Sequence, residues 1–336
     1  MRWLRLTKPW IGGEEPAAVQ RVLDSGWLTE GTVTRRFERA VAQYVGAKHA
    51  VAVCNCTVAL ELCLRAYGVT GNVVVPSFTH PGTIRAVLNA GASPLLCDVD
   101  LTTYNSNLAV IPCETEAYMP VSWAGHPVDH APIPTVEDAA CSLGAETHGV
   151  KTGAAGTTCF SFHPRKLITT GEGGMVTTND AAIAERVREL KHFAHGNYKL
   201  SDVNSAIGLA QMPKLNRIIA RRRNMAHVYH DLLGDATSIR PPREADGTRH
   251  TFQTYAVSLA DADRDDVIQR LAQQGIETQV GTDALHVLPE YTDVPRVDTL
   301  ANAEQLHRRL LALPMAYDLT DEDQQRVVDA LRSCVA

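Results

Sequence analysis

The sequence predicts an α/β protein with a mainly parallel central sheet, helices on both faces of that sheet, and a smaller C-terminal α+β domain. Strand-like and helix-like segments alternate from residue 49 to residue 100, which is typical of parallel strands joined by helical crossovers. The chain has 336 residues, more than a single hydrophobic core usually organises. Beyond residue 248 the order of segments changes, which indicates a separate lobe.

Local patterns place the elements of the N-terminal half. Apolar residues recur every three or four positions in the segments expected to form helices, which are 14–24, 34–44, 57–68 and 83–91. Short apolar runs bounded by turn residues predict strands at 49–55, 72–77 and 93–100. The alternation of the two kinds of segment favours parallel pairing of the strands.

The stretch 104–136 breaks the alternation, because its five prolines leave little room for a helix. About nine residues separate the segments 121–125 and 134–139, fewer than a helical crossover between parallel strands usually needs. We therefore expect a loop or a shortened crossover there. The patterns then predict a strand ending at Asp138, a strand at 174–179, and long helices at 180–192 and 202–233.

The C-terminal part follows a different order. We expect a strand at 250–259, a helix at 263–274, a further strand, and helices near 300–312 and 320–333. Pro and Gly residues in the segment 234–248 are typical of a boundary between domains. The chain is therefore divided into a large domain, 1–240, and a small domain, 241–336.

Composition excludes several classes of function. The formal net charge of -6 gives no field that would attract nucleic acid. No apolar run is long enough for a signal peptide or a membrane span, so we expect a cytoplasmic protein without a membrane partner. The eight cysteines form no CxxC pair and the histidines fit no ligand motif, so we expect buried thiols and no metal.

Lys166 is the first candidate for a catalytic residue. It lies between two apolar stretches and is followed by Gly171, Gly173 and Gly174, where the backbone can approach a ligand closely. A salt-bridging surface lysine is the simpler interpretation of the position alone. A lysine whose pKa is lowered by burial could instead form a Schiff base with the aldehyde of pyridoxal phosphate (PLP).

Asp138 is the second candidate. It follows an apolar strand, at the edge where open α/β sheets bind ligands, and a carboxylate there could keep the pyridine nitrogen of PLP protonated. A helix N-cap is an equally good interpretation of Asp138, and Glu137 would point to the other side.

A third group of residues could bind a phosphate. The segment 51–60 predicts a strand, a tight turn at Asn55 and Cys56, and a helix that Thr57 opens, and the first amides of a helix bind anions. A plain N-cap is an equally good interpretation of Thr57. Ser161 could reach the same phosphate or be buried with its hydrogen bonds satisfied.

Six motifs in this order resemble the nucleotide-sugar aminotransferase family (DegT/DnrJ/StrS type) of fold-type I PLP-dependent enzymes. The motifs are SGWLTEG (25–31), VAVCNCTVAL (51–60), VVVPSFTHPGT (73–83), VEDAACSLGA (136–145), CFSFHPRKLITTGEGG (159–174) and GNYKLSDVNSAIGLAQM (196–212). The resemblance implies that Lys166 is the Schiff-base lysine and Asp138 the partner of the pyridinium. It also implies that Ser161 and the amides of Cys56 and Thr57 hold the phosphate.

The resemblance carries further implications and some departures. His80 lies where the family has the ring that stacks on the pyridine, and Asn197 matches an asparagine that crosses a homodimer interface to the neighbour's phosphate. Cys141 replaces a glutamine that contacts the ring hydroxyl of the cofactor, and Cys56 replaces a glycine of the phosphate turn. Lys199 stands where arginine is common, which keeps the charge but loses bidentate geometry.

The resemblance implies a transaminase of amino sugar and natural product biosynthesis. An amino group would pass from L-glutamate to a nucleotide-linked keto sugar by a ping-pong mechanism. A keto cyclitol or another natural-product ketone is an alternative substrate, and a catalytically silent regulatory protein with this fold is an alternative from another class. Dehydratases of the family have histidine in place of the lysine, so Lys166 argues against them.

Overall fold

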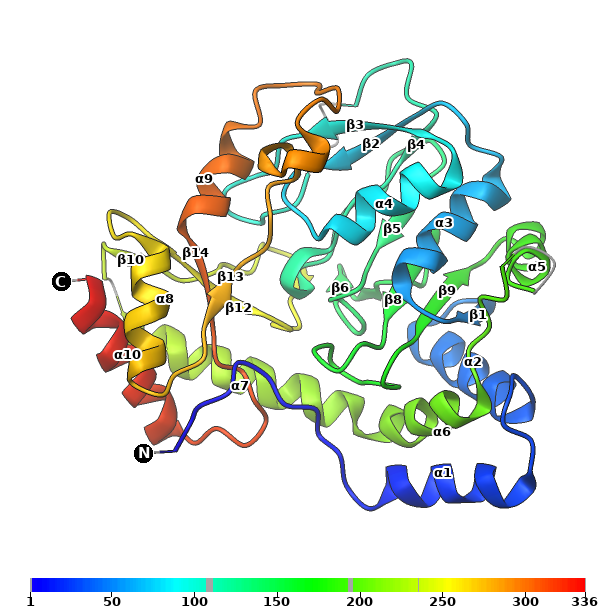
Figure 1. The fold of residues 1–336 in the computed structure, drawn as a ribbon, viewed down its shortest axis with the longest axis horizontal. Coiled ribbons are helices and arrows are strands. Elements are labelled where there is room, and N and C mark those ends of the chain that lie inside the picture. Colours follow the sequence, from blue (N-terminus) through cyan, green and yellow to red (C-terminus); the bar gives the residue numbers. More distant parts are fainter. Residues whose placement is uncertain (1, 107–110, 193–195, 235, 336) are drawn as a thin grey trace.

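The computed structural model describes residues 2–106, 111–192, 196–234 and 236–335. Among them, seven strands form the central sheet in the order β1-β9-β8-β5-β4-β2-β3 (Figure 1). Parallel bridges from Tyr118 to Thr135 and from Val121 to Asp138 join β4 to β5. The strands are β1 (His49–Val53), β2 (Asn72–Pro76), β3 (Ser93–Cys97), β4 (Ala117–Tyr118), β5 (Val136–Asp138), β8 (Thr157–Ser161) and β9 (Gly174–Thr178).

The mainly parallel sheet expected from the sequence is confirmed. Only β9 runs against its neighbours in this sheet as described, since it pairs antiparallel with both β1 and β8. The crossover between β4 and β5 contains a 3-10 turn at Trp123–Gly125 and no α-helix in the described residues. This agrees with the loop that the prolines predicted.

Helices cover both faces of the central sheet, as expected. Because successive side chains of a strand point to opposite faces, Val51, Val53 and Val176 pack under α3 and α5, whereas Ala52 and Met175 pack under α2 and α7. The helices of this part are α1 (Glu14–Ser25), α2 (Thr32–Val45), α3 (Cys56–Tyr67), α4 (Pro81–Ala90), α5 (Ala181–Leu190), α6 (Asp202–Gln211) and α7 (Leu215–Leu233).

Two of the expected helices were wrong in part. The helix expected at 202–233 is interrupted by a 3-10 turn at Met212–Lys214, because Pro213 cannot donate a backbone hydrogen bond. The last residues of the helix expected at 300–312 form strand β14 (Leu310–Leu313). All four side chains of β14 are buried, and a short apolar run of this kind does not distinguish a buried strand from a buried helix.

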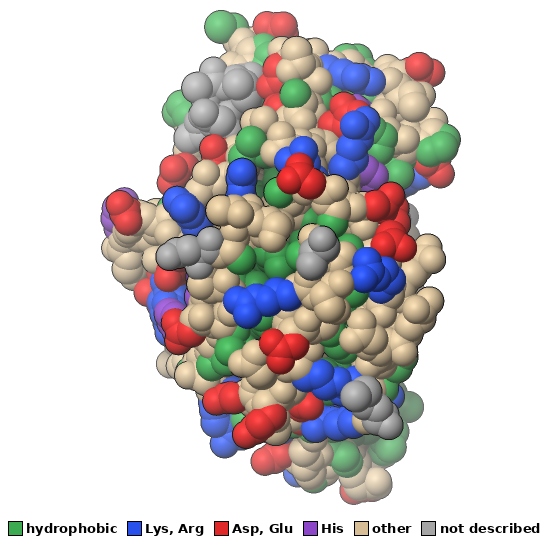
Figure 2. Space-filling view, turned by 90° about the vertical axis from the view of Figure 1, so that its left-hand side faces the viewer, with side chains coloured by type: hydrophobic (Ala, Val, Ile, Leu, Met, Phe, Trp, Pro, Cys, Tyr) green, Lys and Arg blue, Asp and Glu red, His purple; other side chains and the backbone are tan. Residues whose placement is uncertain are grey.

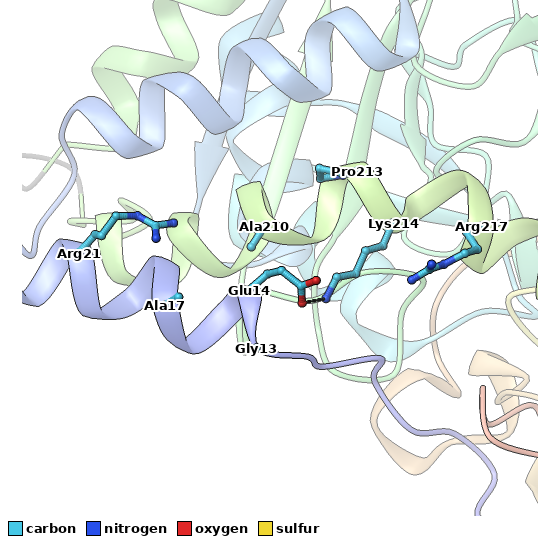
Figure 3. Close-up of a pocket in the computed structure, with 8 residues that line it drawn as sticks. All are labelled: Gly13, Glu14, Ala17, Arg21, Ala210, Pro213, Lys214 and Arg217. Carbon is cyan, nitrogen blue, oxygen red and sulfur yellow. Dashed lines mark hydrogen bonds and ion pairs between the residues drawn. The ribbon is translucent and has the colours of Figure 1, made fainter.

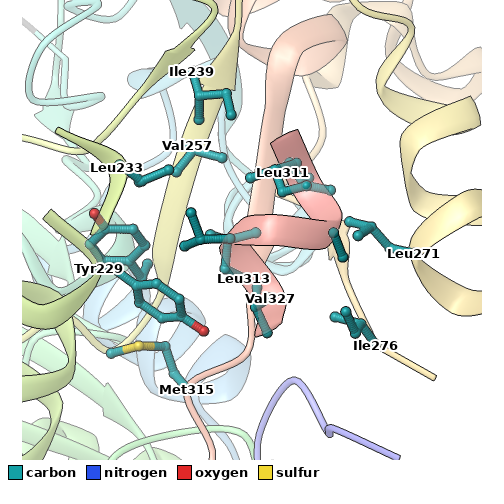
Figure 4. Packing of buried hydrophobic residues seen from close by; sticks show 14 of the residues in the cluster. Tyr229, Leu233, Ile239, Val257, Leu271, Ile276, Leu311, Leu313, Met315 and Val327 are labelled. Atoms are coloured by element: carbon teal, nitrogen blue, oxygen red, sulfur yellow. The ribbon is translucent and has the colours of Figure 1, made fainter. Parts of the chain in front are cut away.

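The C-terminal part has its own antiparallel sheet, in the order β10-β12-β14-β13. Its hydrophobic core also includes Leu4 near the N-terminus. Tyr229 and Leu233 of α7 belong to the same core (Figure 4). The α7 helix therefore links the two cores, and the boundary at residue 240 stays a prediction. The remaining elements are β6 (Glu146–Thr147), β7 (Val150–Lys151), β10 (Ile239–Arg240), β11 (Thr248–Arg249), β12 (Tyr255–Leu259), β13 (Gln279–Val280), α8 (Arg264–Gln273), α9 (Ala301–Arg309) and α10 (Asp321–Val335).

Two surface properties bear on the partners expected from the composition. Acidic and basic side chains are interspersed over the face that carries the C-terminal sheet (Figure 2), so the described residues of this face form no broad basic patch. Among the helices of the described ranges, none has both the length and the hydrophobicity of a membrane span.

Candidate active site

A cavity of about 620 Å³ lies at the carboxyl ends of the parallel strands, between the central sheet and β13 of the C-terminal sheet. This is the edge at which open α/β sheets bind ligands. The residues proposed from the sequence that line it are Cys56, Thr57, His80, Asp138, Cys141, Ser161 and Lys166. The structure thus brings together segments that lie more than a hundred residues apart in the chain.

The start of α3 supplies free amides to this cavity. Asn55 is the N-cap, and its side chain accepts a hydrogen bond from the Val58 amide (2.9 Å), so the N-cap interpretation of Thr57 is wrong. Within the described ranges, the amides of Cys56 and Thr57 have no hydrogen-bond acceptor in the protein. Amides in this position, at the positive end of a helix, bind anions such as phosphate.

Two glycines keep this turn open. A Cβ on Gly174 would lie 2.8 Å from the Cys56 nitrogen and closer still to the Asn55 carbonyl. A Cβ on Gly82 would lie 2.6 Å from the Thr57 hydroxyl. Side chains at either position would displace the groups that a phosphate would contact.

Asp138 ends β5 with its carboxylate fixed in the cavity wall. Its Oδ2 accepts a hydrogen bond from the Thr83 hydroxyl (2.7 Å) and its Oδ1 accepts one from the Ala140 amide (3.1 Å). The described residues directly after Asp138 form turns and no helix, so the N-cap interpretation of this residue is wrong. Glu137 points to the other side of the strand, as expected, and pairs there with His130 (2.9 Å).

Lys166 lies in the loop after β8, half-buried, with its Nζ 3.2 Å from the Cys141 sulfur. Burial is the largest single influence on the pKa of Lys166 and lowers it, but the nearby Cys141, Asp138 and Cys56 together raise it by more, so the pKa lies above its ordinary value. The expectation that burial lowers this pKa is therefore wrong for the protein without its cofactor, because burial brings the amine next to groups that stabilise its charge.

The remaining candidates differ in their surroundings. His80 caps α4, with its Nδ1 accepting a hydrogen bond from the Gly82 amide (3.0 Å). The Ser161 hydroxyl accepts one from the His163 amide (3.4 Å). Asn197 is exposed in the loop between α5 and α6, has a left-handed backbone (φ 56°), and lies outside the cavity. Its contact with a partner subunit stays a prediction.

Sequence reasoning missed several residues that line the cavity. Thr83 lies within a quoted motif, but its bond to Asp138 depends on the contact of α4 with β5 and leaves no local signal. Gln253 enters from the segment before β12, and the buried Arg222 holds its carbonyl (2.6 Å). Burial lowers the pKa of Arg222 to about 10. The positions of Thr83 and Gln253 in the cavity depend on contacts between segments that are distant in the chain, so the sequence alone does not indicate them.

A second hollow of about 800 Å³ lies between α1 and the start of α7 (Figure 3). None of the residues proposed from the sequence lines it. Lys214, the lysine in its wall, is paired with Glu14 (3.0 Å) and Glu15 (2.5 Å). Because that amine is already held by two carboxylates, the hollow is a poorer candidate for chemistry than the cavity at the strand ends.

Comparison with known proteins identifies the family. A model of the DegT/DnrJ/EryC1/StrS aminotransferase family matches residues 9–332. The chain belongs to this family. It is a PLP-dependent aminotransferase, as the six motifs indicated.

Solved structures of several related proteins have the same fold. DesI, crystallised in the presence of its TDP-sugar product, is 30% identical, with a TM-score of 0.93 over 100% of this chain and 93% of DesI. The aminotransferase TlmJ from Streptoalloteichus hindustanus is 29% identical, with a TM-score of 0.92 over 99% and 98% of the two chains. DesV of S. venezuelae is 29% identical, with a TM-score of 0.91 over 99% and 98%.

The residues of the cavity fit PLP. The aldehyde of the cofactor requires an amine, and Lys166 is the lysine that lines the cavity in the described residues. The pyridinium requires an anion, and the buried Asp138 is a carboxylate in the same cavity. The phosphate requires hydrogen-bond donors. Within the described residues, the amides of Cys56 and Thr57 donate no hydrogen bond to the protein, so both are available to a phosphate. All three chemical requirements are met in one cavity.

Proposed function

We propose that this aminotransferase transfers an amino group from L-glutamate to a nucleotide-linked keto sugar by a ping-pong mechanism. The observation that carries the proposal is that Lys166 and Asp138 share one cavity with the free amides of α3. The sugar substrate is supported by the likeness to DesI over the whole chain. In a ping-pong mechanism the two substrates use the cavity one after the other, so a single site suffices.

Each residue of the cavity has a proposed role. When bound, PLP supplies the aldehyde that accepts an amine and a pyridinium ring that withdraws electrons from the reacting carbon. Lys166 would hold the cofactor covalently and, once its amine is free, move the proton at that carbon. Asp138 would keep the ring nitrogen protonated. Ser161 and the amides of Cys56 and Thr57 would bind the phosphate.

Three further roles complete the proposal. His80 would stack on the ring, and Cys141 would occupy the place where the family's glutamine contacts the ring hydroxyl. Asn197 would reach the phosphate in the neighbouring subunit of a homodimer, so that each site is built from two chains. We place the enzyme in the cytoplasm.

The test of the function uses purified enzyme with PLP, glutamate, and a panel of nucleotide keto sugars and keto cyclitols. Mass spectrometry should find an aminated nucleotide sugar, and initial rates should give the parallel lines of a ping-pong mechanism. Amination of a cyclitol alone would contradict the proposed substrate. Converging lines would contradict the proposed mechanism.

The role of Lys166 is tested separately by borohydride reduction of the holoenzyme, followed by peptide mapping. A pyridoxyl group should be found on Lys166 and be absent from Lys166→Ala. The exposed Lys48 gives a matched control, since Lys48→Ala should keep the label and the activity. A label on any other lysine of the wild-type enzyme would contradict the assignment.

A further inference from the structure

The cavity has very few permanent positive charges. Of the lysine and arginine side chains in the described residues, only Arg165 and Lys166 line it. Lys166 is assigned to the cofactor. An amino-acid donor carries carboxylates, and burying a carboxylate without a cationic or hydrogen-bonding partner is costly. Among the described residues of this chain, Arg165 is therefore the permanently cationic side chain of the cavity that is available to an anionic substrate.

The surroundings of Arg165 fix its position without neutralising its charge. Its NH1 donates a hydrogen bond to the Gln279 Oε1 of β13 (2.8 Å), and its carbonyl accepts one from the Gln253 Nε2 (2.7 Å). Its amide donates to the His163 Nδ1 (3.2 Å). In the described part of the chain, Arg165 forms no ion pair with a carboxylate.

A guanidinium in this state is suited to binding a carboxylate. It has five N–H donors, and one of them is used by the neutral Gln279 side chain. The remaining donors include the parallel pair that binds a carboxylate in a bidentate manner. The Gln279 amide orients the guanidinium and leaves its charge for a ligand.

We propose that Arg165 binds a carboxylate of the amino donor and so determines the specificity for that substrate. The inference rests on the proposed function, which supplies glutamate as the donor. Arg165 is adjacent to Lys166 in the chain, and both side chains line the same cavity. The α-carboxylate of an amino acid is bonded to the carbon that carries the amine, whereas the sugar ring separates the diphosphate of a nucleotide sugar from its keto carbon. The carboxylate is thus the anion that must lie nearest to Lys166.

The test measures binding of two probes to the holoenzyme by calorimetry. Glutarate carries both carboxylates of glutamate but no amine, so it cannot react, and TDP carries a diphosphate. Arg165→Gln should weaken glutarate binding about ten- to a hundred-fold, as expected for the loss of a charge-assisted pair, and leave TDP binding unchanged. The glutarate affinity of Arg165→Lys should lie between those of the wild-type enzyme and Arg165→Gln, because lysine keeps the positive charge but cannot form the bidentate pair.

Steady-state kinetics and a matched variant complete the design. Arg165→Gln should raise the KM for glutamate more than it lowers kcat, with an unchanged KM for the keto substrate. Arg296→Gln removes an exposed arginine outside the cavity. This variant should have unchanged affinities for glutarate and TDP and unchanged KM values for both substrates.

Three results would overturn the inference. The first is unchanged glutarate binding in Arg165→Gln, and the second is absent glutarate binding in the wild-type enzyme. The third is an Arg165→Gln variant that loses TDP binding and keeps glutarate binding, which would make Arg165 a diphosphate ligand. If the wild-type enzyme binds glutarate through Arg165 yet aminates no nucleotide sugar, the proposed function fails and the carboxylate site stands. If it aminates the sugar from glutamate yet Arg165→Gln binds glutarate normally, only this inference fails.

Discussion

Replacing Gly174 by alanine should damage both the fold and the binding of the cofactor. The added Cβ would lie 2.8 Å from the Cys56 nitrogen and closer still to the Asn55 carbonyl. These are backbone atoms, so they cannot rotate out of the way as the end of a side chain could. Since β9 is a central strand paired on both sides, the turn before α3 must shift instead.

The size of the effect follows from this overlap. Overpacking a well-packed interior typically costs about 1–3 kcal/mol, and we expect the free energy of unfolding to fall by that amount. The turn that shifts is the one that presents the Cys56 and Thr57 amides to the phosphate. A similar loss in binding energy corresponds to a PLP affinity roughly ten- to a hundred-fold weaker.

The assay combines urea denaturation of the cofactor-free protein with a fluorescence titration of PLP. Gly13→Ala is the matched control, because a Cβ there meets nothing within 4 Å and the backbone has an ordinary φ of -77°. We expect that control to remain within about 1 kcal/mol of wild type, with unchanged PLP affinity. If Gly174→Ala behaves like Gly13→Ala in both measurements, the reasoning about the turn is refuted.

Two further predictions concern the network around β5. Thr83→Val removes the hydrogen bond to Asp138 (2.7 Å) and should lower the free energy of unfolding by about 1.5–3 kcal/mol, as is typical for bonds to charged groups; a loss below about 0.5 kcal/mol in urea denaturation would contradict it. Burial lowers the pKa of His130, but the hydrogen bond to Glu137 and the attraction of its charge together outweigh burial. The pKa of His130 therefore lies above the ordinary 6.5. The pair therefore stabilises the fold fully below pH 6.5, and the stabilisation is lost as the pH rises through the higher folded pKa. His130→Gln should flatten this part of the stability profile, and an unchanged profile in the variant would show that another group is responsible.

Most of the candidate site could be predicted from short motifs in the sequence. Lys166, Asp138 and the turn before α3 lie in short segments whose residue types allow this chemistry, and the order of the six motifs favoured it over the structural interpretation of each segment alone. Their meeting in one cavity follows from the alternation of strands and helices, because the carboxyl ends of parallel strands meet at one edge of a sheet. For this reason the cavity could be expected from the pattern of elements together with the motifs.

The parts that could not be predicted depend on packing between distant segments. The bond from Thr83 to Asp138 and the contact of Arg165 with Gln279 join residues 55 and 114 positions apart. The strand at 310–313 looked helical because four buried leucine and alanine residues satisfy either period. The segment is a strand because it pairs with β12, and no residue pattern within the segment indicates that pairing.

The two cysteines that the resemblance indicates as departures, Cys56 and Cys141, lie against the two groups with proposed catalytic roles. The Cys56 sulfur lies 3.8 Å from the Asp138 Oδ1, and the Cys141 sulfur lies 3.2 Å from the Lys166 Nζ. Burial, with the nearby Asp138 adding to it, raises the pKa of Cys56 well above its ordinary value, so Cys56 stays a neutral thiol and adds no second negative charge beside Asp138. A thiol is also a weak hydrogen-bond donor. The orientation of Asp138 therefore depends on the Thr83 hydroxyl and the Ala140 amide, and the neutral Cys56 thiol leaves the carboxylate able to take the role proposed for it.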